Sequence, residues 1–208
     1  MSAEPSPRGV ANADLVLVRH ARPVLRSGVK ASQWRLEEDA VPAVTALAAE
    51  IDRQLGVHGR RVTRLWSSTE PKAVETAAAL GAEWGLKTQQ LADLGEHRRG
   101  ALPFLGDVEW RETIARMFAR PHEVVLGLES ADEARVRFTA AVREVVASAG
   151  TGEVSAVATH ATVMTLLVAP SNGLDHLTLW GSLEMPDALF VDSRDDFRLL
   201  ARAWQDRP

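Results

Sequence analysis

Residues 15–22 read LVLVRHAR, four apolar residues that stop abruptly at charged and polar side chains. Such an uninterrupted apolar run is typical of a strand buried on both faces of a sheet. Strands of this kind belong mainly to parallel sheets with helices on both sides. The stretch therefore predicts an interior strand that ends at Arg19 and His20.

Two later segments repeat this arrangement. Residues 62–66 predict a second strand that runs into SSTEPK, residues 67–72, and residues 154–158 predict a third that runs into THAT, residues 159–162. In open parallel sheets the carboxyl ends of the strands lie along one edge, and ligands bind there. We therefore expect three polar segments, far apart in the sequence, to meet at one edge of the sheet.

The residues at these three strand ends suit an anion. They supply two imidazoles, His20 and His160, the guanidinium of Arg19 and the ammonium of Lys72. Helix N-termini at the same edge would add backbone N–H donors and favour negative charge. Lysine is also rare in this chain, with 3 Lys against 21 Arg, so Lys72 does not reflect a general preference. This set of groups predicts a site for a phosphoryl group.

The sequence between the strands shows helical patterns. Apolar residues recur at helical spacing, with Pro in two first turns and a capping-box pattern at Ser130 and Glu133. A closing hairpin is expected at the C-terminal end. The alternation predicts an α/β protein, a three-layer α/β/α sandwich around a mostly parallel central sheet. The expected helices are 41–55, 71–84, one starting after residue 130, and 161–168, and the hairpin strands are 189–192 and 197–203.

Composition excludes several classes of protein. The 208 residues contain no cysteine, which rules out a disulfide framework, thiolate catalysis and cysteine-ligated zinc. The net charge of −4 argues against nucleic-acid partners, and no apolar run approaches the roughly 20 residues of a membrane span. We therefore expect a cytoplasmic protein, with residues 1–12 as a flexible lead and residues 13–208 as one domain.

The motifs together resemble a known family. Residues 17–23, LVRHARP, are similar to the Arg-His-Gly signature of the histidine phosphatase (phosphoglycerate mutase-like) superfamily. Residues 67–77, SSTEPKAVETA, resemble its second motif, Ser-Ser-Pro-x-x-Arg-Ala-x-x-Thr-Ala, and residues 159–162 resemble its later His-Gly motif. Two shorter segments, 94–96 and 127–130, resemble further parts of the family pattern. The matches follow the family's order and span residues 15 to about 165.

The resemblance implies a phosphohistidine mechanism that needs no metal or other cofactor. His20 would attack phosphorus and carry the phosphoryl group as a covalent intermediate. Arg19 would grip two phosphate oxygens, and Lys72 occupies the family's second arginine position. His160 would add a second, charged imidazole, and Ala161 belongs with the phosphate-binding residues. The intermediate implies a small phosphorylated substrate.

The resemblance also implies an acid, Glu96, that protonates the leaving oxygen and later takes a proton from water. Asp93 and His97 lie close to it in sequence and remain alternatives. Two features depart from the family pattern. Lys72 offers a point charge where a bidentate fork is usual, and alanine replaces the motif glycine after each histidine, at Ala21 and Ala161.

Substrate recognition is less clearly indicated. Arg22 and Trp34 are candidates for contacting the substrate, although a surface role fits Arg22 equally well and a packing role fits Trp34 better. Arg98 and Arg99 either meet an acidic substrate or solvate their loop. The leading hypothesis is a phosphatase for a small phosphorylated metabolite, because the chain offers little material to cover the site as a mutase would. The alternatives are a phosphoglycerate mutase-type enzyme and a noncatalytic relative that binds phosphate ligands or proteins.

Overall fold

A six-stranded mixed sheet forms the centre of the computed structural model, which describes residues 9–100 and 105–204. The strand order is β3-β2-β4-β1-β5-β6. The first four strands in this order are parallel, and β5 and β6 form an antiparallel hairpin at one side. The strands are β1 (Leu15–Arg19), β2 (Arg64–Ser67), β3 (Thr88–Gln90), β4 (Ser155–Thr159), β5 (Asp187–Asp192) and β6 (Arg198–Arg202).

Six α-helices connect and cover these strands. Four of them begin where the sequence predicts. In α2, Pro71 lies in the first turn, and Gly85, in the left-handed conformation (φ 65°), ends the helix. Ser130 and Glu133 form the predicted capping box at the start of α4. The helices are α1 (Val41–Gly56), α2 (Pro71–Trp84), α3 (Asp107–Ala119), α4 (Ala131–Ala147), α5 (Ala161–Ser171) and α6 (His176–Ser182).

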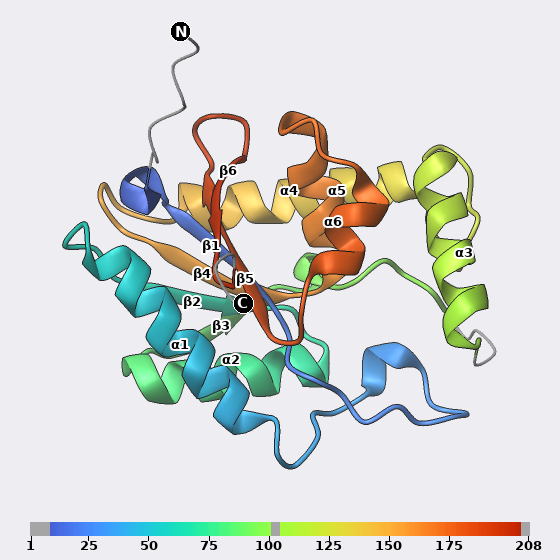
Figure 1. Cartoon of the computed structure of the whole chain (residues 1–208), viewed down its shortest axis with the longest axis horizontal. Helices are drawn as coiled ribbons and strands as arrows, with labels where there is room; N and C mark the ends of the chain where they lie inside the picture. The colour runs from blue at the N-terminus through green and yellow to red at the C-terminus, as the bar shows by residue number, and fades with distance from the viewer. Residues whose placement is uncertain (1–8, 101–104, 205–208) are drawn as a thin grey trace, which may run out of the picture.

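The alternating side chains of β1 show how the layers pack. Val16 and Val18 lie in a core with α1 and α2, whereas Leu15 and Leu17 lie in a second core with α4 and α5. The two helix pairs therefore cover opposite faces of the sheet (Figure 1). This arrangement confirms the predicted three-layer α/β/α sandwich and explains why β1 is apolar at every position up to Val18.

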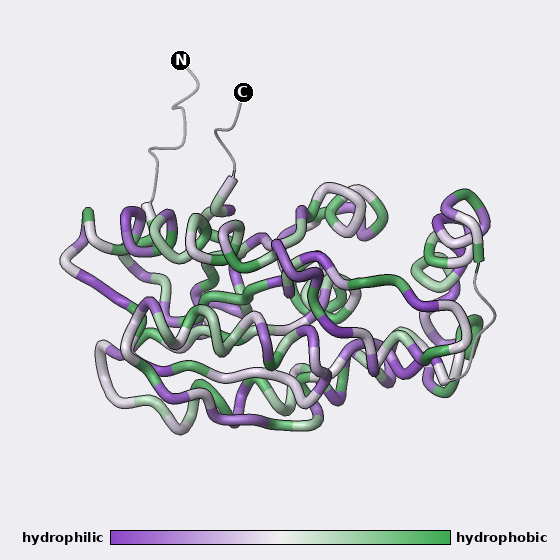
Figure 2. The backbone as a smooth tube through the Cα atoms, turned by 90° about the horizontal axis from the view of Figure 1, so that it is seen from below, coloured by the Kyte–Doolittle hydropathy of each residue, from purple (hydrophilic) through white to green (hydrophobic). Residues whose placement is uncertain are grey.

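The sequence did not predict β3, α3 or α6. The strand β3 has only three residues and lies at the edge of the sheet, so its Thr-Gln-Gln sequence shows no apolar pattern. Helix α3 lies to one side of the sheet (Figures 1 and 2) and packs through Ile114 and Met117 into a third, smaller core with α4 and α5. Residues 101–104 lie outside the described residues.

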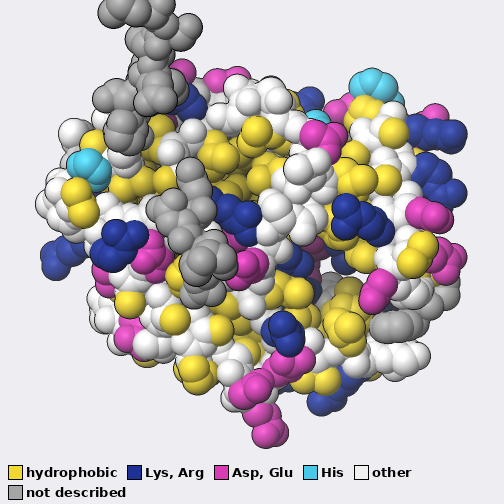
Figure 3. Space-filling model, in the orientation of Figure 1, with side chains coloured by type: hydrophobic (Ala, Val, Ile, Leu, Met, Phe, Trp, Pro, Cys, Tyr) yellow, Lys and Arg dark blue, Asp and Glu magenta, His cyan; other side chains and the backbone are white. Residues whose placement is uncertain are grey.

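The N-terminal boundary lies earlier than expected. Val10–Asn12 form a 3₁₀ helix, and Val10 is buried against α1 and β5 in the first core. These residues therefore belong to the domain, whereas the rest of the expected lead, residues 1–8, lies outside the described residues. Over the described parts of the chain, none of the helices is both long and apolar enough to cross a membrane. Acidic and basic side chains are interspersed on the face shown in Figure 3.

Phe138 of α4 tests the importance of the second core. Its side chain is fully buried between α4 and the sheet, so Phe138→Ala should lower the free energy of unfolding by about 3–5 kcal/mol. Val136 on the same helix is 62% exposed, and Val136→Ala should change the stability by less than about 0.5 kcal/mol. Urea unfolding of both variants measures the difference, and equal effects would contradict this packing.

Candidate active site

Strand pairing brings the two predicted histidines together. In the parallel β1–β4 pair, Arg19 lies opposite Thr159, so His20 and His160 follow at the same level of the sheet edge. The backbone N–H of His20 donates to the carbonyl of Thr159 at 3.0 Å, which extends the pairing by one residue. The two rings meet edge to face with their centroids 5.2 Å apart. The predicted convergence of these residues is therefore present.

The hydrogen bonding of His20 fixes which nitrogen is free. Its Nδ1 lies 2.7 Å from the carbonyl oxygen of Ala21, and since a carbonyl can only accept, Nδ1 carries the proton and Nε2 has a free lone pair. Burial lowers the pKa of His20 well below 6.5, and the charges of His160 and Lys72 lower it further. The ring is thus neutral at physiological pH. The backbone of Ala21 is held by Thr76 of α2, whose Oγ1 accepts from its N–H at 3.0 Å.

His160 is buried at the start of α5. Its Nε2 lies 2.8 Å from Oγ of Ser68 and 3.6 Å from Oε1 of Glu70. Burial, followed by the charge of Lys72, lowers its pKa well below 6.5. With these neighbours the imidazole is neutral in the absence of phosphate, and a phosphate dianion beside it would favour the charged form that the resemblance implies. Ala161 follows as the first residue of α5, so its amide lies at the helix N-terminus.

Arg19 lies at the same edge, at the end of β1. One of its terminal nitrogens donates to the carbonyl of Leu183, which precedes β5. Burial lowers its pKa to about 10, while the negative charges of Glu96 and Asp187 act in the opposite direction. The guanidinium therefore remains charged at neutral pH and supplies a partly buried cation beside His20.

Lys72 is buried in the first turn of α2 and has two partners. Its Nζ donates to the carbonyl of Ala31 at 2.8 Å and to a carboxylate oxygen of Glu70. Burial lowers its pKa, and the charge of Glu70 opposes this effect. Glu70 was not among the predicted site residues. An acidic residue two positions before the lysine of an anion-binding motif was the signal that could have found it.

Glu96 lies opposite these groups and is paired with Arg99. Its Oε2 accepts from Arg99 at 3.0 Å and from the N–H of Thr162 at 3.4 Å, and its Oε1 accepts from the N–H of His97 at 2.8 Å. Burial acts to raise its pKa, but Arg99, His160 and the His97 amide outweigh burial, so its pKa is below 4.5. This ion pair places the Arg99 guanidinium inside the site and not in solvent around its loop. Its guanidinium also stacks on Trp110 of α3, with 4.5 Å from its central carbon to the ring centroid.

Arg137 of α4 and Glu129, which precedes α4, hold the loop that carries Glu96. Arg137 donates to the carbonyls of Asp93, Gly95 and Glu96 at 2.8–3.1 Å. The same guanidinium forms two hydrogen bonds to the carboxylate of Glu129. A buried bidentate ion pair therefore positions the predicted acid, and sequence reasoning did not identify it.

Gly127 allows its backbone to lie close to the backbone of Arg98 and Arg99. It has φ of +81°, and a Cβ at this position would lie 2.4 Å from the carbonyl oxygen of Arg98 and from Cα of Arg99. Close by, the N–H of Arg98 donates to the Glu129 carboxylate at 2.9 Å. The alternative acid His97 is buried, and its Nε2 donates to the carbonyl of Glu129 at 2.8 Å. These contacts give His97 a structural role.

The two residues predicted to contact the substrate, Arg22 and Trp34, lie in the segment between β1 and α1. The backbone carbonyl of Trp34 accepts from the N–H of Lys72 at 3.1 Å, while its indole donates within its own loop, to Val29 at 3.1 Å. Trp34 thus lies beside the start of α2. Arg22 is exposed, and its carbonyl accepts from Glu37 at 3.0 Å. Contact of either side chain with a substrate remains a prediction.

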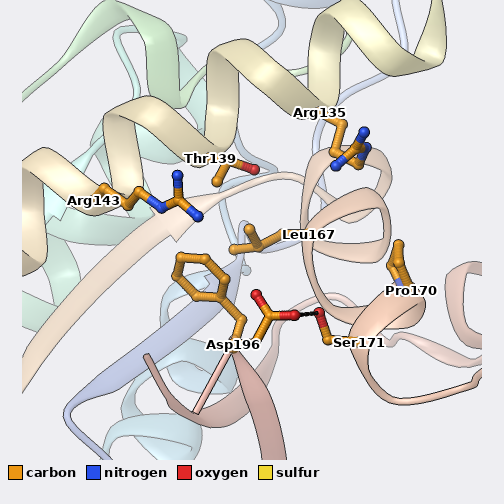
Figure 4. Close-up of a pocket in the computed structure, with 8 residues that line it drawn as sticks. Arg135, Thr139, Arg143, Leu167, Pro170, Ser171 and Asp196 are labelled. Carbon is orange, nitrogen blue, oxygen red and sulfur yellow. Dashed lines mark hydrogen bonds between the residues drawn. The ribbon is translucent and has the colours of Figure 1, made fainter. Parts of the chain in front are cut away.

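A surface pocket of about 290 Å³ lies elsewhere on the molecule (Figure 4). It includes Pro170 and Ser171 at the C-terminal end of α5, whereas His160 precedes the N-terminal end of this helix, about 15 Å away at 1.5 Å per residue. The pocket is therefore separate from the histidine pair. The pocket is lined by Arg135, Thr139, Arg143, Leu167, Pro170, Ser171, Asp196 and Phe197.

Among residues 9–100 and 105–204, no three His, Asp or Glu side chains could hold one metal ion.

Solved structures share this fold at low sequence identity. A mycobacterial glucosyl-3-phosphoglycerate phosphatase superposes with a TM-score of 0.65 at 20% identity, covering 89% of this chain and 94% of that one. A phosphoglycerate mutase from Bacillus anthracis gives a TM-score of 0.62 at 16% identity, with coverages of 87% and 89%. YhfR from Bacillus stearothermophilus gives 0.61 at 20% identity, with coverages of 86% and 91%.

Sequence comparison with curated proteins gives no match. The sequence model of the histidine phosphatase superfamily, branch 1, matches residues 15–189, which include both histidines and all three motif segments. The fold, the paired imidazoles and this match agree, and the chain belongs to the histidine phosphatase superfamily, branch 1.

Proposed function

We propose that this protein is a phosphatase that hydrolyses a small phosphorylated metabolite through a phosphohistidine on His20. The observation that carries the proposal is the state of the His20 ring. It is buried and neutral, and its Nδ1–H is held by the Ala21 carbonyl, which leaves the Nε2 lone pair available beside His160. A nucleophilic imidazole needs this protonation state and this tautomer.

In the first step Nε2 of His20 attacks phosphorus, and the bond from phosphorus to the leaving oxygen breaks. The electron pair of that bond stays on the leaving oxygen, which takes a proton from Glu96. Glu96 must be protonated for this step, although Arg99 favours its charged form. A phosphate dianion between them would compete for Arg99 and raise the pKa of Glu96, so substrate binding itself prepares the acid.

In the second step water attacks the phosphorus of phosphohistidine. Glu96, now a carboxylate, takes a proton from this water, and the N–P bond breaks to return the electron pair to Nε2. Inorganic phosphate leaves, and both residues are restored. The same carboxyl group thus acts as an acid and then as a base.

Four further groups would stabilise the negative charge on the phosphoryl oxygens. Arg19 and Lys72 supply positive charge, the amide of Ala161 supplies an N–H donor at a helix N-terminus, and His160 gains a proton when the dianion is present. Because these groups are buried and held in place by neighbouring carbonyls and hydroxyls, they need little reorganisation. Removal of one such donor typically costs ~10²–10³ in rate.

A structural neighbour and the segment between β1 and α1 suggest which substrates to test first. Arg22 and Trp34 lie in the segment between β1 and α1, and they would contact the part of the substrate beyond the phosphoryl group. One structural neighbour is named for a phosphorylated sugar acid, glucosyl-3-phosphoglycerate. Phosphorylated sugars and sugar acids are therefore the first candidates in a substrate screen.

Replacement of the proposed nucleophile should abolish turnover. A panel of phosphorylated metabolites and an aryl phosphate is tested for phosphate release with the native protein and with His20→Ala. We expect release by the native protein and a loss of at least about 10³-fold in the variant. His58→Ala is the matched control, because His58 lies outside the site after the end of α1. Undiminished release by His20→Ala would overturn the mechanism, and exchange of phosphate between positions of phosphoglycerate with little release would favour a mutase.

Glu96→Gln should lower kcat/KM, which reports the phosphorylation step alone, by about 10²–10⁴-fold, because the amide cannot donate the proton to the leaving oxygen. The loss should be smaller for a substrate whose leaving group is a good anion, since such a group needs no proton. Glu112→Gln, an exposed position on α3, serves as control. An equal loss for good and poor leaving groups would argue that Glu96 only holds Arg99 in place.

The protonation state of His20 is open to direct measurement. Its lowered pKa predicts a neutral ring at pH 6, with the proton on Nδ1, so its ¹⁵N shifts should stay constant from pH 8 to pH 6. By linkage, a histidine that stays neutral in the folded state costs stability as pH falls below the unfolded value of 6.5. The loss of stability between pH 7 and pH 5.5 should therefore be smaller in His20→Gln. A His20 titration midpoint at or above 6.5 would contradict this account.

A further inference from the structure

A carboxylate, Glu70, lies among the phosphate-binding groups. It is the N-cap residue of α2, and its side chain is 13% exposed. One carboxylate oxygen accepts from Nζ of Lys72. The other accepts from the backbone N–H of Glu96 at 2.9 Å and lies 3.6 Å from Nε2 of His160. Glu70 therefore touches three parts of the site at once.

These contacts occupy most of the lysine ammonium. An ammonium has three N–H donors, and Lys72 gives one to the carbonyl of Ala31 and one to Glu70. At most one donor is left for a phosphate oxygen. A guanidinium in the same place would have five donors in a planar fork and could bind Glu70 and phosphate together.

Glu70 also changes the charge of the site. The cations around the two neutral imidazoles are Arg19, Lys72 and Arg99. Glu96 offsets Arg99 at 3.0 Å, and Glu70 offsets Lys72. Arg19 is thus the cation of these three that has no carboxylate directly bonded to it among the described contacts. A phosphate dianion therefore meets a site in which two of these three cations already have a carboxylate partner.

We propose that Glu70 is a positioning residue that acts through Lys72: it holds the ammonium in place and keeps the affinity of the site for inorganic phosphate low. This inference rests on the proposed phosphatase function, in which phosphate is the last product to leave. The negative charge of Glu70 repels a bound phosphate dianion. The hydrogen bond from Lys72 to Glu70 must also weaken before Lys72 can give phosphate more than one N–H donor. Both effects favour release of the product.

The sign of the effect separates this role from a structural one. Glu70→Gln keeps the shape and one acceptor oxygen, which can serve either Lys72 or the Glu96 amide, but removes the negative charge. Loss of this like charge, which lies 3.6 Å from Nε2 of His160, together with release of the Lys72 donor, should tighten phosphate binding by about tenfold or more. If Glu70 only supported the loop of Glu96 and the start of α2, its replacement would leave phosphate binding unchanged or weaken it.

Calorimetric titration with inorganic phosphate measures this directly and needs no turnover. The native protein, Glu70→Gln and Glu83→Gln are compared, because Glu83 is an exposed carboxylate on the same helix. We expect a gain of about tenfold in affinity for Glu70→Gln and less than about twofold for Glu83→Gln. Unchanged or weaker binding in a folded Glu70→Gln variant would overturn the proposal.

Two additional measurements complete the test. In a Lys72→Arg background the gain from Glu70→Gln should be clearly smaller, because a guanidinium has donors for both partners, and an equal gain would show that Glu70 does not act through residue 72. The titration is repeated in His20→Ala, where no phosphoryl transfer is expected. The gain should persist there, so failure of the phosphatase function and failure of this inference give different results.

Discussion

The parallel pairing of β1 with β4 is the constraint on which the site depends. It places Arg19 opposite Thr159, and each strand is followed at once by a histidine. The pairing of β2 with β4 then brings Ser68 within 2.8 Å of the second imidazole. A shift of one residue in either pair would turn these side chains toward opposite faces of the sheet. The geometry of the nucleophile is thus set by the backbone of the buried sheet.

Burial and charge balance explain the chemistry of the site. Desolvation keeps both imidazoles neutral, and this is the form that a nucleophile requires. Two cations in the site have carboxylate partners, Lys72 with Glu70 and Arg99 with Glu96. Such pairs hold buried charges in place and leave them ready to exchange one anionic partner for another. The incoming phosphoryl group is the anion that this exchange would serve.

Much of the fold could be predicted from local patterns. The apolar strands β1 and β4, the Pro and Gly signals of α2 and the capping box of α4 are each encoded by adjacent residues, and the structure confirms them. The short polar strand β3 carries no such signal. Its place in the sheet depends on pairing with β2, which is a tertiary contact.

The site residues also include some that could be predicted from local patterns and some that could not. His20, Arg19, Lys72 and His160 could be predicted to meet because they follow strands that end at one edge. Arg99 and Arg137 could not be assigned roles, because their partners include Trp110 of α3 and the loop carbonyls at 93–96. Glu70 could have been linked to Lys72, two residues away, but its contacts with the Glu96 amide and His160 are tertiary. The neutral state of His160 in the absence of phosphate could not be predicted for a related reason, since its complete burial is a property of the folded chain.

The covalent intermediate is the central claim, and trapping it is the most direct measurement. The protein is mixed rapidly with a substrate that it turns over, quenched in alkali to preserve phosphohistidine, digested and analysed by mass spectrometry. The account predicts one phosphorylated peptide, the one containing His20, and a ³¹P–¹⁵N coupling to Nε2 in labelled protein. Phosphate on another residue, or steady hydrolysis with no phosphorylated His20 at any quench time, would contradict it.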